Sequence, residues 1–471
     1  MKKYLHISLI WLLAFAAHGQ RPQALTLEQC IDAAISSNYD IQNQLSTVKA
    51  SEATYRQSEL EKLPSVSGDF SQGFNLGRNI DPFSNQYVTK PINSATLGVS
   101  STVTIYNGDL IKNTVILNKN EQKLAELEVE NLKFNIKKDV TLAFLEVLVK
   151  QEVLRLKQEQ KSIIEYQLQR NQEMSRYGNE ATGIGIDLKA QLESEQYGII
   201  QTESDITFAK LRLMQLMNLK PGTQISLKEP IVSTNASAVN EGVENLSGLS
   251  FLRQKQQEVA QSDLRIRMSE GTKKPSVFLN SGLYTNYSSQ AAPRIKLLDG
   301  EPQQFLQQSD TEFIQLNNQV YPLTRVITQP NFEEIKRGYV RQLFSNAGLS
   351  LSLGLSYPIY DKNQRNTQIQ LAKINKLIAQ TSYNQTQTRL SNELAEIKTW
   401  ISTSMAQYNQ AVKQTAAQQK AFELATLRFE EGMINFASFN QAKLSLEAAK
   451  SNVIQNKYTH YFYNLLYGYY R

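Results

Sequence analysis

The sequence predicts an α+β membrane protein whose 471 residues follow one structural plan twice. Two long stretches, 109–219 and 361–470, have the apolar spacing of helical hairpins. Four shorter stretches alternate apolar and polar residues, which is the pattern of β-strands with one apolar face. An N-terminal export signal and matching flanks around the strands then indicate a duplicated chain that leaves the cytoplasm.

The N-terminus has the three parts of a secretory signal. Two of its first three residues are lysines, residues 7–17 are apolar, and Ala-His-Gly at 17–19 resembles a cleavage site. We therefore expect residues 1–19 to be a signal peptide. No other apolar run reaches the roughly twenty residues of a membrane-spanning helix.

Cysteine and histidine are too scarce for most catalytic and metal sites. Cys30 is the only cysteine, which excludes an intrachain disulfide, and its place on one helical face with Leu27 and Ala34 predicts a buried apolar residue. His460 is the only histidine outside the signal, so a zinc site or a Ser-His-Asp triad is hard to build. The net charge of +6 is dispersed and does not favour nucleic acid. We expect no catalytic residue, no cofactor and no metal.

The first repeat, residues 20–247, begins with an amphipathic helix that Leu63-Pro64 ends. The expected elements are a helix at 25–62, strands at 64–76 and 95–107, a helical hairpin at 109–219, and a mixed segment of short strand and loop at 220–247. In the first strand, Val66, Phe70 and Phe74 share one face with polar residues between them. A half-buried soluble sheet shows the same alternation, but the export signal and the second copy favour membrane strands.

The first hairpin begins with a proline-free arm from Asp109 to Tyr177 and turns at the glycine cluster Gly178–Gly185. Apolar residues return to one face of this arm at spacings of mostly three and four: Leu124, Leu127, Leu132, Ile136, Val140, Phe144, Val147 and Leu154. A helix of this length is on the order of 100 Å long, at about 1.5 Å per residue. It needs partners along its length, so we expect coiled-coil packing.

The second repeat, residues 248–471, restarts the plan. The expected elements are a helix at 249–272, strands at 275–287 and 346–359, and a helical hairpin at 361–470. A polar insertion, 288–342, separates the two strands and is expected to be a loop. Residues 62–66 match 273–277, and Arg176-Tyr177 matches Arg428-Phe429. The two hairpins have nearly equal lengths whereas the loops differ, as expected if long helices must stay in register.

Four strands cannot close a membrane barrel, because the smallest known barrels need about eight and an open edge cannot lie in lipid. We therefore expect the chain to oligomerise, with three copies supplying twelve strands. The long helices would continue such a barrel as a polar-lined, coiled-coil tube. A tube of this kind is a conduit, which accounts for the many Gln, Asn, Ser and Lys residues at helical spacing.

The order of elements and the hairpin tips resemble the TolC family of outer-membrane efflux proteins. The tip signatures are Arg176-Tyr177 before a glycine turn and Arg428-Phe429-Glu430-Glu431-Gly432, each followed by an amphipathic return helix. The resemblance covers essentially the whole mature chain. It implies a homotrimer with a twelve-stranded outer-membrane β-barrel and a long periplasmic α-helical barrel. It also implies a passive exit duct in tripartite efflux or type I secretion, with a periplasmic adaptor, an inner-membrane transporter of the RND, ABC or MFS class, and outer-membrane lipid as partners.

The resemblance further implies a gate of acidic residues at the periplasmic mouth. Asp187 aligns with one of the family's acids, and Glu180 is expected to assist it. The second tip departs from the family, because Ser438 and Gln441 stand where acids are frequent and Ile434 where a basic residue can stand. The alternative for Asp187 is a solvated acid favoured by the helix dipole. The other expected tip residues are Arg176, Tyr177, Arg428, Phe429 and Gly432.

Two other functions compete with a channel. A secreted enzyme would have to use a carboxylate pair such as Glu333-Glu334, although adjacent acids on a polar loop are usually only solvated. A secreted or surface coiled-coil adhesin, a structural protein without channel activity, would explain the helices but not the two matching strand pairs. The exported substrate is not encoded in the sequence, because drugs, metals, siderophores and polypeptides would use a similar tube.

Overall fold

A computed structural model of the chain describes residues 24–81, 85–176, 182–220, 222–230 and 246–471. The expected signal peptide, Tyr177 and Glu180 lie outside these residues. The chain divides into two compact units. The helical unit is formed by the described parts of Met1–Thr54, Asn118–Asp263 and Lys373–Arg471, and the strand unit by Tyr55–Leu117 and Leu264–Ala372.

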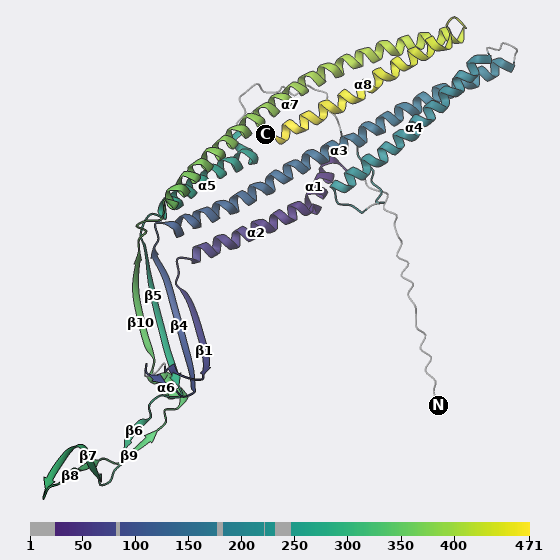
Figure 1. Cartoon of the computed structure of the whole chain (residues 1–471). Helices are drawn as coiled ribbons and strands as arrows, with labels where there is room; N and C mark the ends of the chain where they lie inside the picture. The colour runs from purple at the N-terminus through teal and green to yellow at the C-terminus, as the bar shows by residue number, and fades with distance from the viewer. Residues whose placement is uncertain (1–23, 82–84, 177–181, 221, 231–245) are drawn as a thin grey trace, which may run out of the picture. The chain divides into compact units, whose positions relative to one another are not determined.

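The strand unit is built around one antiparallel sheet with the strand order β1-β4-β5-β10 (Figure 1). Its members are β1 (Ser65–Asn75), β4 (Ile92–Tyr106), β5 (Ser276–Ser288) and β10 (Gly348–Ser356). β4 and β5 come from the two halves of the sequence and pair with Val99 opposite Leu283. The sheet therefore joins the two repeats, and β1 and β10 are its edges.

One face of this sheet is apolar and exposed, and the other is polar. The apolar side chains of Phe70, Leu351 and Leu353 are 61%, 71% and 70% exposed. On the opposite face, hydroxyl groups pair across strands, with 2.8 Å between Ser67 Oγ and Ser100 Oγ. The apolar face therefore has no covering within the described chain along most of its length, which marks it as a surface for a partner or a lipid.

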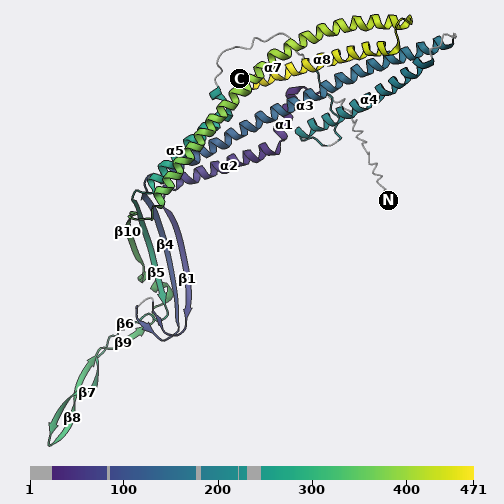
Figure 2. The same cartoon turned by 45° about the horizontal axis from the view of Figure 1, so that its top comes forward.

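The helical unit is formed by long helices and a short one. They are α1 (Leu27–Ser37), the first part of α2 (Tyr39–Leu60), most of α3 (Leu110–Arg176), α4 (Thr182–Leu216), the first part of α5 (Ser250–Gly271), most of α7 (Gln364–Glu430) and α8 (Phe436–Tyr469), with the 3₁₀ turn η1 (Leu246–Gly248) before α5. α3 and α7 each contain 67 residues. α3 runs beside α4 and α7 beside α8, in both views (Figures 1 and 2).

The main core of the helical unit lies where α1, α3, α4 and α8 meet. Its centre contains Cys30, Phe144 and Leu213, whose side chains are fully buried. Thr26 and Gln29 form a capping box that fixes the start of α1. Burial raises the pKa of the Cys30 thiol to about 11, and the expectation of a buried apolar cysteine is confirmed.

The structure corrects the helix expected over 25–62, which is two helices. Asn38 between them has an extended backbone, with φ −71° and ψ 124°, and its side-chain oxygen accepts a hydrogen bond from the Ile41 N–H at 3.0 Å. Ser37 Oγ also donates to the Met217 carbonyl at 2.7 Å. The break is therefore stabilised by a cap and by a contact with a segment far away in the sequence.

The structure also corrects the insertion expected to be a loop. It contains β6 (Arg294–Leu297), β7 (Gln303–Leu316), β8 (Gln319–Gln329), β9 (Phe332–Ile335) and the short helix α6 (Tyr339–Ser345). β6 pairs with β9 and β7 with β8. Asn317 and Asn318, both with positive φ, make the two-residue turn between β7 and β8. In the first repeat, β2 (Asn79–Ile80) and β3 (Tyr87–Val88) form a smaller hairpin.

None of the helices in the described ranges is both long enough and apolar enough to cross a bilayer.

Candidate site at the hairpin tips

The turn between α7 and α8 is fixed by backbone hydrogen bonds. The Met433 N–H donates to the Arg428 carbonyl at 2.8 Å, and the Gly432 N–H donates to the Phe429 carbonyl at 3.1 Å. This pair of bonds is the Schellman motif, and it requires the left-handed backbone that Gly432 has, with φ +69°. Gly432 is therefore a structural residue of the tip.

The return helix begins at a side-chain cap. Asn435 Oδ1 accepts a hydrogen bond from the Ser438 N–H at 2.9 Å. Ser438 stands where the resemblance to the family implies that acids are frequent. Its backbone N–H donates the hydrogen bond that caps the start of α8.

Aromatic rings hold the ends of α7 and α8 together. The ring of Phe429 stacks on that of Phe439, with 4.8 Å between centroids. Phe422 lies 5.6 Å from Phe439, and Ile434 packs against the same cluster. Phe439 is 1% exposed, so this apolar cluster gives the second tip a rigid base. The side chain of Phe429 therefore packs inside the tip. Ile434 makes an apolar contact at the position where the family can have a basic residue.

A buried ion pair links the two hairpins. Lys443 Nζ on α8 lies 2.7 Å from Glu195 Oε1 on α4, and their side chains are only 1% and 6% exposed. Gln191 Nε2 donates a second hydrogen bond to the same carboxylate oxygen at 3.3 Å. Because separating the pair would leave two charges buried without compensation, this contact holds α8 in position against α4.

Two further contacts join the hairpins nearer the turns. Arg170 NH1 on α3 lies 2.5 Å from Glu430 Oε2 at the end of α7, and this hydrogen bond raises the pKa of Arg170. Gln167 Nε2 donates to the other oxygen of Glu430 at 3.4 Å. The Glu430 carboxylate therefore accepts hydrogen bonds from two side chains of α3, Arg170 and Gln167. These bonds hold the two hairpin tips next to each other.

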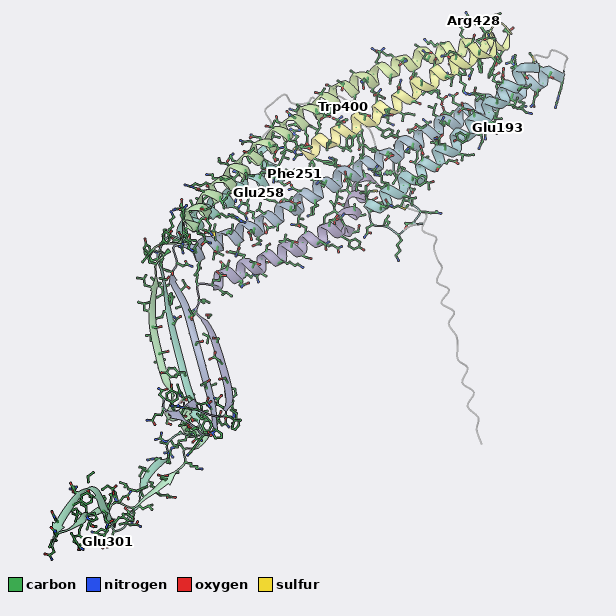
Figure 3. All side chains as sticks on the ribbon, viewed as in Figure 1. Glu193, Phe251, Glu258, Glu301, Trp400 and Arg428 are labelled. Carbon is green, nitrogen blue, oxygen red and sulfur yellow. The ribbon has the colours of Figure 1, made fainter. Side chains whose placement is uncertain are left out.

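The expected gate residue Asp187 lies in the second turn of α4 and is exposed. Within the described part of the chain, no hydrogen bond or ion pair engages its carboxylate. Arg176 is the last residue of α3 and is exposed. Figure 3 labels Arg428 at the end of α7 that adjoins the turn, and its side chain is exposed. The single chain thus brings the tips together but leaves Asp187, Arg176 and Arg428 open to water or to another molecule.

The chemistry considered for an enzyme is not assembled. Glu333 and Glu334 are consecutive in β9 and lie opposite Lys296 and Ile295, so their carboxylates point to opposite faces of the strand. His460 is 4% exposed, and its Nε2 lies 2.9 Å from Asn464 Nδ2. Among the described residues there is no cluster of acids, histidines or cysteines that could hold a metal ion.

Sequence reasoning missed the buried ion pair. Lys443 lies on the same helical face as Phe439 and Leu446, at spacings of four and three, and all three side chains are buried. A lysine between two apolar residues on one face was therefore the available signal. Glu195 has the same signal, because Leu192 and Ile199 lie on its helical face at spacings of three and four. Neither pattern predicts that the two residues pair, because they come from different hairpins.

A family model described as Outer membrane efflux protein matches residues 30–219 and 334–461. Among solved structures, VceC from Vibrio cholerae is similar with a TM-score of 0.73 and 13% identity over 94% of each chain. The CmeC outer membrane channel from Campylobacter jejuni has a TM-score of 0.73 and 14% identity over 94% of this chain and 85% of that one. The open MtrE outer membrane channel of Neisseria gonorrhoeae has a TM-score of 0.67 and 13% identity, covering 94% and 88%. No curated protein matches by sequence.

Proposed function

The chain belongs to the outer membrane efflux protein family, and from this membership we propose how it forms and gates its channel. Its function is that of an outer-membrane channel of efflux systems, and the adhesin alternative is wrong. The family and the fold are those of passive channels. In tripartite efflux or type I secretion, such a channel is the exit duct for substrates that an inner-membrane transporter and a periplasmic adaptor deliver.

The observation that carries the proposed assembly is the four-stranded sheet, which among the described residues has two free edges and an apolar face that is uncovered along most of its length. An unpaired edge cannot lie in lipid, because its N–H and C=O groups would have no hydrogen-bond partners. β10 of one copy pairs with β1 of the next, and three copies close twelve strands into an outer-membrane β-barrel. The apolar face then contacts lipid, and the Ser- and Thr-rich face lines the lumen.

Export and topology follow from the same assembly. Residues 1–19 direct the chain across the inner membrane. The helical unit lies in the periplasm, where α3, α4, α7 and α8 of three copies form the α-helical barrel. The insertion lies on the outer side of the membrane, because it connects two membrane strands at the end away from the turns into α3 and α7.

The partners bind at the hairpin tips. Ile186, Leu427 and Met433 have side chains that are 69%, 60% and 73% exposed. Exposed apolar side chains on the hairpins that also carry Arg176 and Arg428 suit a protein contact, because apolar area supplies affinity and charges supply orientation. The proposed partner there is a periplasmic adaptor, which connects the channel to an inner-membrane transporter of the RND, ABC or MFS class.

Asp187 is the proposed gate residue. In a trimer, three copies of its exposed carboxylate converge near the channel axis, and Glu180 adds to the negative charge. Like charges held close raise one another's cost of ionising and attract cations into the mouth. The attraction is strongest at low ionic strength, where screening is weak.

The substitution Asp187→Asn tests this gate. We expect the preference for cations over anions in single-channel recordings to fall a few-fold at low salt, with trimers intact. Glu193→Gln is the matched control, because Glu193 is also an exposed acid on α4 but lies farther from the turn (Figure 3). If Asp187→Asn leaves both selectivity and conductance unchanged, Asp187 is only a solvated acid near the helix start.

A further inference from the structure

The short helix α6 is fastened across one end of the sheet, on its apolar face. Thr285 Oγ1 donates to the Leu343 carbonyl at 2.5 Å, and the ring of Tyr287 lies 4.4 Å from that of Tyr339. Both Thr285 and Tyr287 are on the same face of β5 as Leu283, because side chains alternate along a strand. α6 therefore covers the end of the face that is otherwise exposed.

A buried glutamine locks α6 in place. Gln342 is 2% exposed; its Oε1 accepts from the Ser288 N–H at 3.1 Å, and its Nε2 donates to the Arg337 carbonyl at 2.9 Å. Asn346 Nδ2 at the end of the helix donates to the Asn286 carbonyl at 2.9 Å. These bonds fix α6 against the sheet, so the backbone positions from which its flanking side chains project are set before any ligand arrives.

One flank of α6 borders an apolar cavity of about 290 Å³. Leu97, Val99 and Leu283 from the sheet line it, together with Val340, Leu343 and Phe344 from the segment of α6. Phe344 is 82% exposed and Val340 64%. These side chains extend the apolar surface of the sheet, and a hydrocarbon chain lying on that surface would enter the cavity directly.

The other flank borders a basic cavity of about 630 Å³. Five cationic side chains line it: Arg294, Lys296, Lys336, Arg337 and Arg341. Glu333 lies opposite Lys296 in the β6–β9 pair. Among the described residues, however, no salt bridge or hydrogen bond engages the side chain of Arg294, Lys296, Lys336 or Arg341. These four cations lie close together beside Arg337, so they repel one another and favour a polyvalent anion.

We propose that α6 and these two cavities form a binding site for a phosphorylated lipid of the outer leaflet. The phosphate lies in the basic cavity, where arginine guanidinium groups donate paired hydrogen bonds to phosphate oxygens. An acyl chain lies against Val340 and Phe344. A free phosphate ion would leave the apolar cavity unused, so the lipid accounts for both flanks. The site rests on the proposed function, because it needs the apolar face of the sheet in the outer membrane.

The test measures binding of three probes to the purified full-length protein in a neutral detergent. The probes are dihexanoyl phosphatidic acid, dihexanoyl phosphatidylcholine and inorganic phosphate. We expect phosphatidic acid to bind at least about tenfold more tightly than either of the other two. Equal binding of phosphatidic acid and inorganic phosphate would overturn the lipid assignment and leave an anion site.

Two double variants separate the cavities. Lys336→Gln with Arg341→Gln removes two exposed cations, and we expect it to weaken phosphatidic acid binding at least about tenfold. Val340→Asn with Phe344→Asn should weaken phosphatidic acid binding but leave inorganic phosphate binding unchanged. The matched control is Arg78→Gln with Arg325→Gln, two cations of the strand unit outside the basic cavity, where Arg78 lies over the Tyr87 ring and Arg325 pairs with Glu312.

Unchanged binding in Lys336→Gln/Arg341→Gln, or an equal loss in the control variant, would overturn the site. Conductance of the same preparations in planar bilayers tests the proposed function separately. If channels form but the lipid does not bind selectively, the lipid site is wrong and the channel stands. If no channels form, the proposed assembly fails whatever the lipid result.

Discussion

At the scale of single residues, the ion pair of Lys443 and Glu195 holds the two hairpins together, and substitutions at this pair test that contact. Lys443→Met leaves Glu195 buried without its cation, and we expect a loss of about 3–5 kcal/mol in stability. Adding Glu195→Leu to Lys443→Met should restore most of it, because an apolar pair needs no desolvation of charge. Thermal unfolding of the detergent-solubilised protein, followed by circular dichroism, gives the comparison.

Lys450→Met provides the control for this prediction. Lys450 pairs with Glu159 at 3.4 Å, but the two side chains are 30% and 45% exposed. Water and salt screen such a pair, so we expect a change of at most about 1 kcal/mol. A loss in Lys443→Met no larger than in Lys450→Met would contradict the view that the buried pair holds α8 against α4.

The buried thiol of Cys30 should be unreactive at moderately alkaline pH. Burial raises the pKa of its thiol to about 11, so at pH 8 only ~0.1% of it is the reactive thiolate. We expect a maleimide to leave the native protein unmodified at pH 8 and to modify it rapidly after denaturation. Rapid modification of the native protein at pH 8 would show that the α1 core opens readily.

Single residues also show what local patterns can and cannot predict. The buried state of Cys30 followed from its place on the apolar face of a helix. Phe429 was identified as a tip residue, but its packing on Phe439 depends on how tightly the Schellman turn at Gly432 closes. Lys443 and Glu195 are 248 positions apart in the sequence, so no local sequence pattern could predict that they pair.

At the scale of elements, the position of the insertion 288–342 tests the proposed membrane topology. Gln307 lies in β7 opposite Arg325 and is exposed. With Gln307→Cys, we expect a membrane-impermeant maleimide to label intact cells, because the insertion lies outside the outer membrane in the proposed topology. Glu193→Cys on α4 is the matched control, and it should be labelled only after the outer membrane is opened. The reverse pattern, with Gln307→Cys protected in intact cells, would refute the topology.

Some helices and strands could be predicted from the sequence, and others could not. Period-two alternation identified stretches where the structure has β1, β4, β5 and β10, because an apolar face exposed to a partner or lipid demands strict alternation. The break at Asn38 was missed because it depends on a contact from Ser37 to Met217. The strands β7 and β8 were missed because both faces carry polar residues, although Asn317-Asn318 was a usable turn signal.

At the scale of the whole molecule, the family followed from the order of weak signals rather than from any one motif. Each tip signature is short, yet the order of one export signal followed by two copies of helix, strand pair and hairpin identified an efflux channel, and the family match confirms this interpretation. In the described part of the chain, the sheet has two edges without a further strand and an apolar face that α6 covers at one end only. The free edges are unstable in lipid, because their N–H and C=O groups lack partners, and the apolar face is unstable in water. We therefore expect assembly and membrane insertion to occur together.

The most direct test of this account is the number of chains in the purified particle. The protein is extracted from the outer-membrane fraction, and the protein mass of the particle in detergent is measured by light scattering with the detergent subtracted. We expect three copies per particle, with no comparable population in the aqueous fraction. A monomer that stays in solution without detergent would contradict it.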